Sequence, residues 1–89
     1  MQTLSIHITG KVQGVFYRQS AKEKAQELGI TGTVKNEQDG SVHIIATGTA
    51  VQLDHLIAWC KQGPPRAMVM KVQIAEIPLQ SFANFIISR

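Results

Sequence analysis

The chain changes its periodicity within one stretch, GKVQGVFYR (Gly10–Arg18). Before it, apolar and polar residues alternate from Leu4 to Ile8, which is the period of a strand packed on one face. After it, apolar residues recur at helical spacing from Ala21 to Leu28, and Gly29 is a typical helix end. The stretch therefore predicts a turn from a first strand into a first helix.

This turn also has the composition of an anion-binding loop. Backbone N–H groups at a helix start lack helical partners and point in one direction. Gly14 lets the backbone turn, so residues 13–17 can present several donors to phosphate oxygens, and Arg18 adds a planar, permanently charged fork. The residues alone leave open a plain strand-to-helix connection with a solvated arginine. The stretch matches neither G-x-x-x-x-G-K-[ST] nor G-x-G-x-x-G, so these nucleotide-binding motifs are not supported.

The rest of the chain continues with strands and one more helix. Strand character covers residues 30–35, where Gly32 indicates a bulge or a close backbone approach, and returns over 41–47 after a tight turn at Asp39-Gly40. A second helix is expected from Thr49 or Ala50 to the breaker at 63–65. A long strand with a phase slip over 67–77 and a short last strand over 82–87 follow. The expected apolar stripe of the second helix consists of Val51, Leu53, Leu56, Ile57 and Cys60.

This order is strand, helix, strand, strand, helix, strand, with a short C-terminal strand added. Two strand–helix–strand units with right-handed crossovers place both helices on one face of an antiparallel or mixed sheet. We therefore expect an α+β two-layer sandwich of the ferredoxin-like type, as a single domain over residues 1–89. Because that fold hosts many functions, the function has to be argued from the site.

Composition excludes several classes of protein. Hydrophobic residues make up 44% of the 89 residues, which is typical of a folded domain, and the single cysteine, Cys60, permits no internal disulfide. The net charge of +3 is scattered, so a polybasic segment for nucleic acid or membrane is not supported. No apolar run approaches the roughly 18 residues of a membrane span, and the N-terminus does not resemble a secretory leader. We expect a cytoplasmic monomer with no nucleic-acid or membrane partner.

Asn36 is a second candidate for the site. Its ordinary interpretation is a turn residue at the end of the second predicted strand. A functional interpretation requires Asn36 to lie beside Arg18. The expected topology makes this plausible, because the first and third strands are central and the second lies beside the third.

The histidines do not indicate a metal site. His7, His43 and His55 have no ligand partner three or four residues away, and we interpret all three as surface residues. Cys60 belongs to the apolar stripe of the second helix, Ser20 has no nearby base in the sequence, and the acidic residues suggest no catalytic pair. Covalent and metal-dependent mechanisms therefore have little support in the sequence.

Four segments resemble the acylphosphatase family, in the family's order and over essentially the whole chain. The stretch Gly10–Arg18 resembles the first family signature, which runs from a glycine through V-Q-G-V to an aromatic residue and an arginine. Gly32–Asn36, followed by Asp39–Val42, resembles the second. Gly63–Val69 resembles the family's G-P-P-x-A-x-V, and residues 85–87 resemble its terminal F-x-I.

The resemblance implies a hydrolase that cleaves the carboxyl-phosphate anhydride bond of a small-molecule acyl phosphate to a carboxylate and inorganic phosphate. It implies that Arg18 holds the phosphate and that Asn36 orients the attacking water. It implies no cofactor and no metal. Thr33 stands where many members have tryptophan or tyrosine, and we expect this to affect packing and stability only. The backbone N–H groups that the resemblance assigns to the phosphate cradle are those of Gln13, Gly14, Val15, Phe16 and Tyr17.

Two alternatives stay open on the sequence. The first is a catalytically silent phosphate- or anion-binding domain on the same scaffold, which the presence of both Arg18 and Asn36 disfavours. The second is a ferredoxin-like RNA-binding module. RNA-recognition domains stack bases on aromatic side chains of their sheet, and the third predicted strand, 41–47, contains none.

Overall fold

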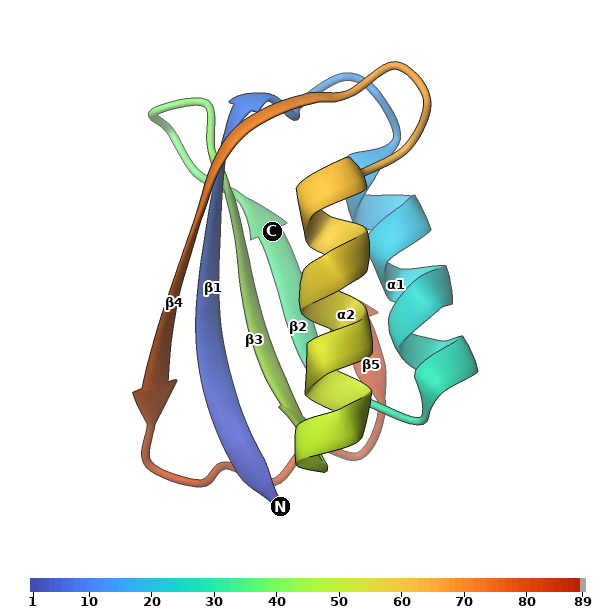
Figure 1. Ribbon diagram of the computed structural model, residues 1–89, viewed down its shortest axis with the longest axis vertical. Coiled ribbons are helices and arrows are strands. Elements are labelled where there is room, and N and C mark those ends of the chain that lie inside the picture. Colours follow the sequence, from blue (N-terminus) through green and yellow to red (C-terminus); the bar gives the residue numbers. More distant parts are fainter. Residues whose placement is uncertain (89) are drawn as a thin grey trace.

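The elements follow one another as the sequence predicts (Figure 1). The computed structural model describes residues 1–88. Within them no helix is both long and apolar enough to cross a lipid bilayer. The elements are β1 (Gln2–Lys11), α1 (Tyr17–Leu28), β2 (Thr31–Asn36), β3 (Val42–Gly48), α2 (Ala50–Gln62), β4 (Met68–Ile77) and β5 (Phe85–Ile87).

The five strands form one mixed sheet in the order β4-β1-β3-β2-β5. The pairs β4–β1, β1–β3 and β3–β2 are antiparallel, whereas β5 is parallel to β2. Both helices lie on one face of the sheet (Figure 1). The ferredoxin-like two-layer sandwich is confirmed, and β1 and β3 are its central neighbours as expected.

The core lies between the helices and the inner face of β1 and β3. Alternate residues of the two strands face inward, and Ile6 is paired directly with Ile44, each with 0% exposure. Alternation predicts this face because successive side chains of a strand point to opposite sides. The helices and β5 complete the core with Ala21, Ala25, Leu53, Leu56, Cys60 and Phe85.

The predicted apolar stripe of the second helix is wrong at one residue, and the last strand is shorter than expected. Val51 is 65% exposed, because it lies in the first turn of α2, outside the side that buries Leu53 and Leu56. The last strand begins at Phe85 and not at 82, because its pairing with β2 starts only where Phe85 lies opposite Gly32.

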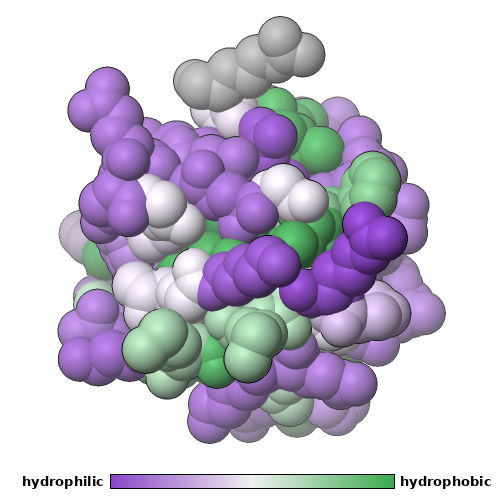
Figure 2. Space-filling model, turned by 90° about the horizontal axis from the view of Figure 1, so that it is seen from above, coloured by the Kyte–Doolittle hydropathy of each residue, from purple (hydrophilic) through white to green (hydrophobic). Residues whose placement is uncertain are grey.

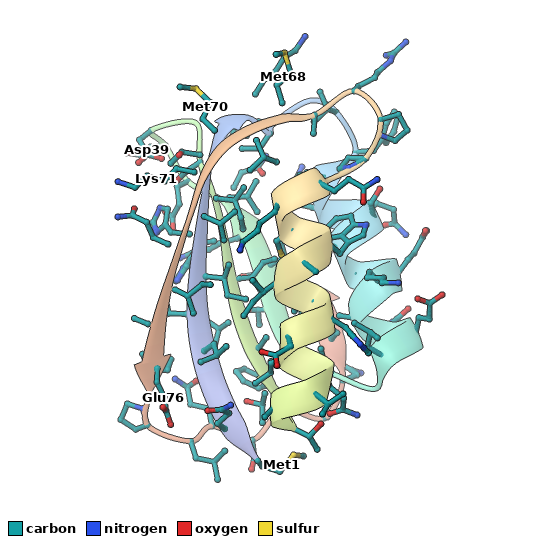
Figure 3. All side chains as sticks on the ribbon, in the orientation of Figure 1. Met1, Asp39, Met68, Met70, Lys71 and Glu76 are labelled. Atoms are coloured by element: carbon teal, nitrogen blue, oxygen red, sulfur yellow. The ribbon has the colours of Figure 1, made fainter. Side chains whose placement is uncertain are left out.

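A bulge in β4 explains the phase slip of this strand. Thr9 of β1 is paired with Lys71, but Gly10 is paired with Val69, so Met70 is an extra residue on β4. The bulge lets Val69 and Val72 pack against the same core although their spacing breaks the alternation. Met68 and Met70 project outward at this end of β4 (Figure 3).

Gly32 marks a close backbone approach and not a bulge. Its φ is +146°, and a Cβ atom at this position would collide with the carbonyl group of Ile45 on β3. The β2–β3 register runs without interruption from Thr31 to Asn36. Glycine at this position therefore allows the backbones of β2 and β3 to approach closely without breaking their register.

Candidate active site

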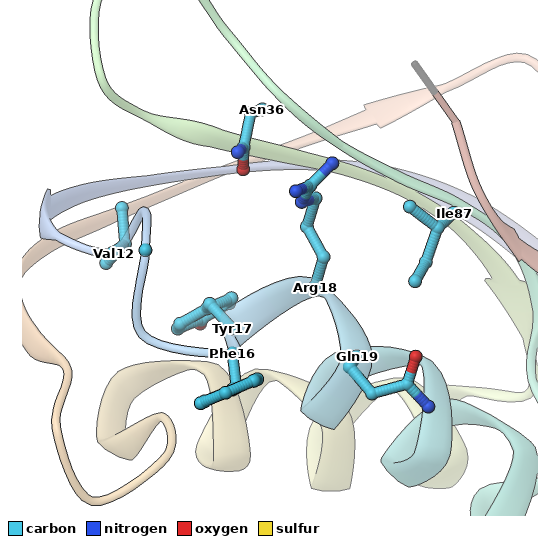
Figure 4. Close-up of a pocket in the computed structure, with 8 residues that line it drawn as sticks. Val12, Phe16, Tyr17, Arg18, Gln19, Asn36 and Ile87 are labelled. Carbon is cyan, nitrogen blue, oxygen red and sulfur yellow. The ribbon is translucent and has the colours of Figure 1, made fainter.

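A hollow of about 610 Å³ opens at the end of the molecule where the β1–α1 loop meets the end of β2 (Figure 4). Seen from above, this end shows hydrophobic surface between hydrophilic side chains (Figure 2). Among the described residues that line the hollow, Arg18 is the only charged one, so this lining favours an anion. The lining residues are Val12, Gly14, Phe16, Tyr17, Arg18, Gln19, Asn36 and Ile87.

The β1–α1 loop has two left-handed residues, one of which is not glycine. Gly14 has φ 73° and Phe16 has φ 64°. Departures from ordinary right-handed geometry turn successive N–H groups toward one side, as in the backbone nests that bind anions. Val15, between them, is buried in the core and anchors the loop.

Tyr17 anchors the loop at the start of α1. Its side chain is buried, its hydroxyl donates to the carbonyl of Cys60 at 2.7 Å, and its ring lies 5.2 Å from that of Trp59. Burial and the contact with Cys60 raise the pKa of the Tyr17 hydroxyl far above its ordinary value, so it stays a neutral donor. The Tyr17 side chain therefore ties the start of α1, and the loop before it, to α2.

The N-terminus of α1 is left uncapped. Its first helical hydrogen bond runs from Ser20 N–H to the Phe16 carbonyl, so the N–H groups of Tyr17, Arg18 and Gln19 precede the helical ladder. No side chain caps this end within residues 1–88, and no acidic residue lies in the first turn.

The N-terminus of α2, unlike that of α1, is capped by side chains. The Thr49 hydroxyl accepts from Gln52 N–H at 3.2 Å, and the Gln52 side chain accepts from Thr49 N–H at 2.9 Å. This capping box satisfies donors that α1 leaves open. The uncapped N-terminus of α1 therefore presents unpaired backbone N–H groups and the positive end of the helix dipole, both of which favour an anion.

Arg18 is the second residue of α1, and its side chain extends from the helix toward Asn36 (Figure 4). The side chain is half-buried, and no carboxylate within residues 1–88 forms an ion pair with it. A cation at a helix N-terminus opposes the dipole by some tenths of a kcal/mol. A bound anion would interact favourably with both the Arg18 guanidinium and the N-terminal end of the α1 dipole.

Asn36 ends β2, opposite Val42 of β3, and its side chain lines the hollow beside Arg18 (Figure 4). Its Oδ1 atom is buried and accepts no hydrogen bond from residues 1–88. An unpaired buried amide oxygen costs roughly 1–3 kcal/mol. Because no hydrogen bond within residues 1–88 holds this oxygen, the Asn36 amide is available to a ligand or a water molecule.

The structure brings together two histidines that we had interpreted as separate surface residues. The β1–β3 register places His7 directly opposite His43, and their rings stack with centroids 5.2 Å apart. Each Nε2 also forms a hydrogen bond to a serine, His7 to Ser41 at 2.8 Å and His43 to Ser5 at 2.7 Å. His55 is exposed on α2, as expected. The described residues contain no group of three or more side chains that could hold a metal ion.

Sequence reasoning missed some of the lining and one side-chain contact. Gln19 and Ile87 line the hollow although the sequence did not mark them as site residues, and Val12 had been considered only as part of the loop. The side chain of Gln13 donates two hydrogen bonds to the β2–β3 hairpin, although only its backbone had been considered. The only feature of the sequence that pointed to Gln13 was its position inside the first family signature.

Comparison with known proteins gives one consistent family. The family model described as Acylphosphatase matches residues 4–87. A curated acylphosphatase of Marinobacter nauticus is 51% identical over 79 residues, which cover 88% of this chain and 86% of the relative. One of Acaryochloris marina is 52% identical over 82 residues, covering 92% of this chain and 88% of the relative.

A solved structure agrees with these relatives. The crystal structure of acylphosphatase from Bacillus subtilis superimposes with a TM-score of 0.97 at 31% sequence identity, and the match covers 100% of both chains. Sequence and fold thus point to the same family over the same residues.

Proposed function

Because the chain belongs to the acylphosphatase family, we propose that the loop 13–17 and Arg18 hold the phosphoryl group of its substrate while Asn36 orients the attacking water. The chain is an acyl phosphate hydrolase, as its family and its relatives establish. The reaction splits the carboxyl-phosphate anhydride bond. The proposal concerns which groups perform it.

One observation carries this assignment. Arg18 and Asn36 come from different elements, α1 and β2, and line the same hollow together with an uncapped helix N-terminus. Among residues 1–88, no acidic side chain lines the hollow, so a dianionic phosphoryl group meets no like charge from these residues. The unpaired Oδ1 of Asn36 adds a polar group that is not committed to the protein.

The mechanism follows from this arrangement. The N–H groups of the loop and of the first turn of α1 donate to the phosphoryl oxygens, and Arg18 pairs with two of them through its planar fork. Phosphoryl transfer depends mainly on positioning and on stabilising charge on these oxygens. Water held by the Asn36 amide attacks phosphorus in line with the carboxylate, which departs as a stable anion. The products are the carboxylate and dihydrogen phosphate.

The chemistry requires no further catalyst in this proposal. A carboxylate is a good leaving group, so neither a nucleophilic side chain nor a metal ion is needed to activate it. We also propose that the protein acts as a cytoplasmic monomer. Its one cysteine, Cys60, is buried and unpaired, which fits a reducing compartment. Sedimentation equilibrium of the purified protein tests the monomer.

The test is hydrolysis of benzoyl phosphate, with a chelator present, by the wild type and by Arg18→Lys and Asn36→Ala. Arg18→Lys keeps the charge but loses the fork, and Asn36→Ala removes the water-holding amide. We expect each substitution to lower kcat/KM by about 10²-fold or more, as for removal of one oriented donor. The chelator is expected to change nothing.

Matched controls separate a role in the site from a general effect. Arg66→Lys and Asn84→Ala make the same chemical changes at exposed residues that are not among those lining the hollow, and should keep wild-type rates. Near-normal activity of Arg18→Lys would rule out the bidentate pairing. A wild type that binds inorganic phosphate but hydrolyses no acyl phosphate would make the chain a silent anion-binding domain.

A further inference from the structure

The position of Asn36 depends on the hairpin that follows it. Asn36 is the last residue of β2, and residues 37–41 form the turn into β3. The turn is closed by Glu37 N–H donating to the Ser41 carbonyl at 2.8 Å. The backbone at Glu37 and Ser41 therefore defines the end of the hairpin from which the Asn36 side chain reaches into the hollow.

The side chain of Gln13 is bonded to this same pair of residues. Its Nε2 donates to the Glu37 carbonyl and to the Ser41 carbonyl, both at 2.8 Å. An amide NH₂ group has two hydrogens, so both donors are used. Within residues 1–88, these are the only side-chain hydrogen bonds from the β1–α1 loop to the hairpin.

The hairpin also has hydrogen bonds within its turn and to β1. The Asp39 carboxylate accepts from Ser41 N–H at 2.9 Å and from the Ser41 hydroxyl at 2.6 Å, and His7 on β1 holds that hydroxyl at 2.8 Å. These bonds make the hairpin a stiff unit. The β1–β3 ladder, which reaches Ile8 and Val42, places the hairpin relative to β1, and the Gln13 side chain adds the link between the base of the hairpin and the β1–α1 loop.

We propose that the Gln13 side chain is a positioning residue, which fixes the distance between the phosphate-holding loop and Asn36. The inference rests on the proposed function of Asn36 and goes beyond it, because it assigns a role to a side chain whose backbone alone had been placed at the phosphate. In-line attack tolerates little error, since a misplacement of 1 Å can lower a rate by about 10²-fold. A cross-link of two short hydrogen bonds at the base of the hairpin prevents such an error.

The test uses Gln13→Met, which keeps the length of the side chain without its donors, and Gln13→Glu, which keeps its shape and sets a carboxylate against two carbonyls. We expect kcat to fall about 10-fold or more with Met and further with Glu. Affinity for inorganic phosphate should change less than kcat, because the backbone donors and Arg18 remain. Gln38→Met makes the same change at an exposed glutamine of the same hairpin and should leave kcat at the wild-type value.

A double-mutant cycle distinguishes positioning of Asn36 from general loss of structure. If Gln13 acts through Asn36, Gln13→Met should lower kcat little further in the Asn36→Ala background. Independent losses that multiply, or a wild-type kcat in both Gln13 variants, overturn the inference. Neither result affects the roles of Arg18 and Asn36, which their own single variants test.

One measurement needs no variant and covers the case in which both Gln13 substitutions unfold the protein. In the wild type, both side-chain amide protons of Gln13 are bonded and should exchange with solvent more slowly than those of Gln38. Equal exchange rates at the two glutamines, measured by NMR, would show that the cross-link does not persist in solution and would overturn the inference.

Discussion

Phe16 combines a left-handed backbone conformation, which is unfavourable for phenylalanine, with an exposed side chain. It is the one non-glycine residue with a positive φ within residues 1–88, and its side chain is 75% exposed. A left-handed conformation costs a residue with a Cβ roughly 1–2 kcal/mol, and burial of the ring does not offset it. The left-handed conformation of Phe16 instead orients the N–H groups of the loop, and this orientation lowers the stability of the fold.

We therefore predict that Phe16→Asn stabilises the protein. Asparagine adopts left-handed geometry more readily than phenylalanine, so the free energy of unfolding should rise by about 0.5–1 kcal/mol. Urea unfolding of the two proteins measures it. Met68→Asn, at another exposed apolar residue without a positive φ, is the control and should give no such gain. A lower free energy of unfolding for Phe16→Asn would show that the ring contributes more than its exposure indicates.

The paired strands β1 and β3 create a pH-sensitive feature that neither strand has alone. Burial is the main cause that lowers the pKa of His43, and the nearby charges of His7 and Lys35 lower it further, whereas Glu37 opposes them. The folded state then binds a proton at His43 less readily than the unfolded chain, whose ordinary histidine value is 6.5. Between these two pKa values the unfolded state holds more protons, so stability rises with pH.

We predict that the free energy of unfolding falls as the pH is lowered from about 6.5 toward the folded pKa of His43. Urea unfolding at a series of pH values measures this loss, and NMR titration assigns it to His43. In His43→Gln the part of the slope that belongs to this residue should disappear. A midpoint for His43 at or above 6.5 in the folded protein would refute the prediction.

The elements differ in how far the sequence determines them. Alternation in Leu4–Ile8 and the helical spacing from Ala21 are properties of one segment, so β1 and α1 could be predicted locally. The bulge at Met70 is a property of two strands, because it exists only in the register between β4 and β1. Val51 was misjudged for a similar reason, since the sequence shows an apolar residue near the stripe but not how α2 lies on the sheet.

At the scale of the whole molecule, the candidate site is assembled from parts that are predictable to different degrees. Arg18 and its loop are contiguous, so the sequence could place them together at a helix start. The nearness of Asn36 follows from the strand order β1-β3-β2, which the topology made plausible. The bonds from Gln13 to the hairpin depend on the distance between two loops, which no local pattern specifies.

The division of labour between Arg18 and Asn36 is tested most directly by titrating inorganic phosphate into Asn36→Ala, with Arg18→Lys as the comparison. If Asn36 serves the water and not the phosphate, Asn36→Ala should bind phosphate within about threefold of the wild type, a difference of at most about 0.7 kcal/mol, although it has lost turnover. Arg18→Lys should bind phosphate much more weakly. Equal loss of phosphate affinity in both variants, measured by calorimetry, would contradict this division.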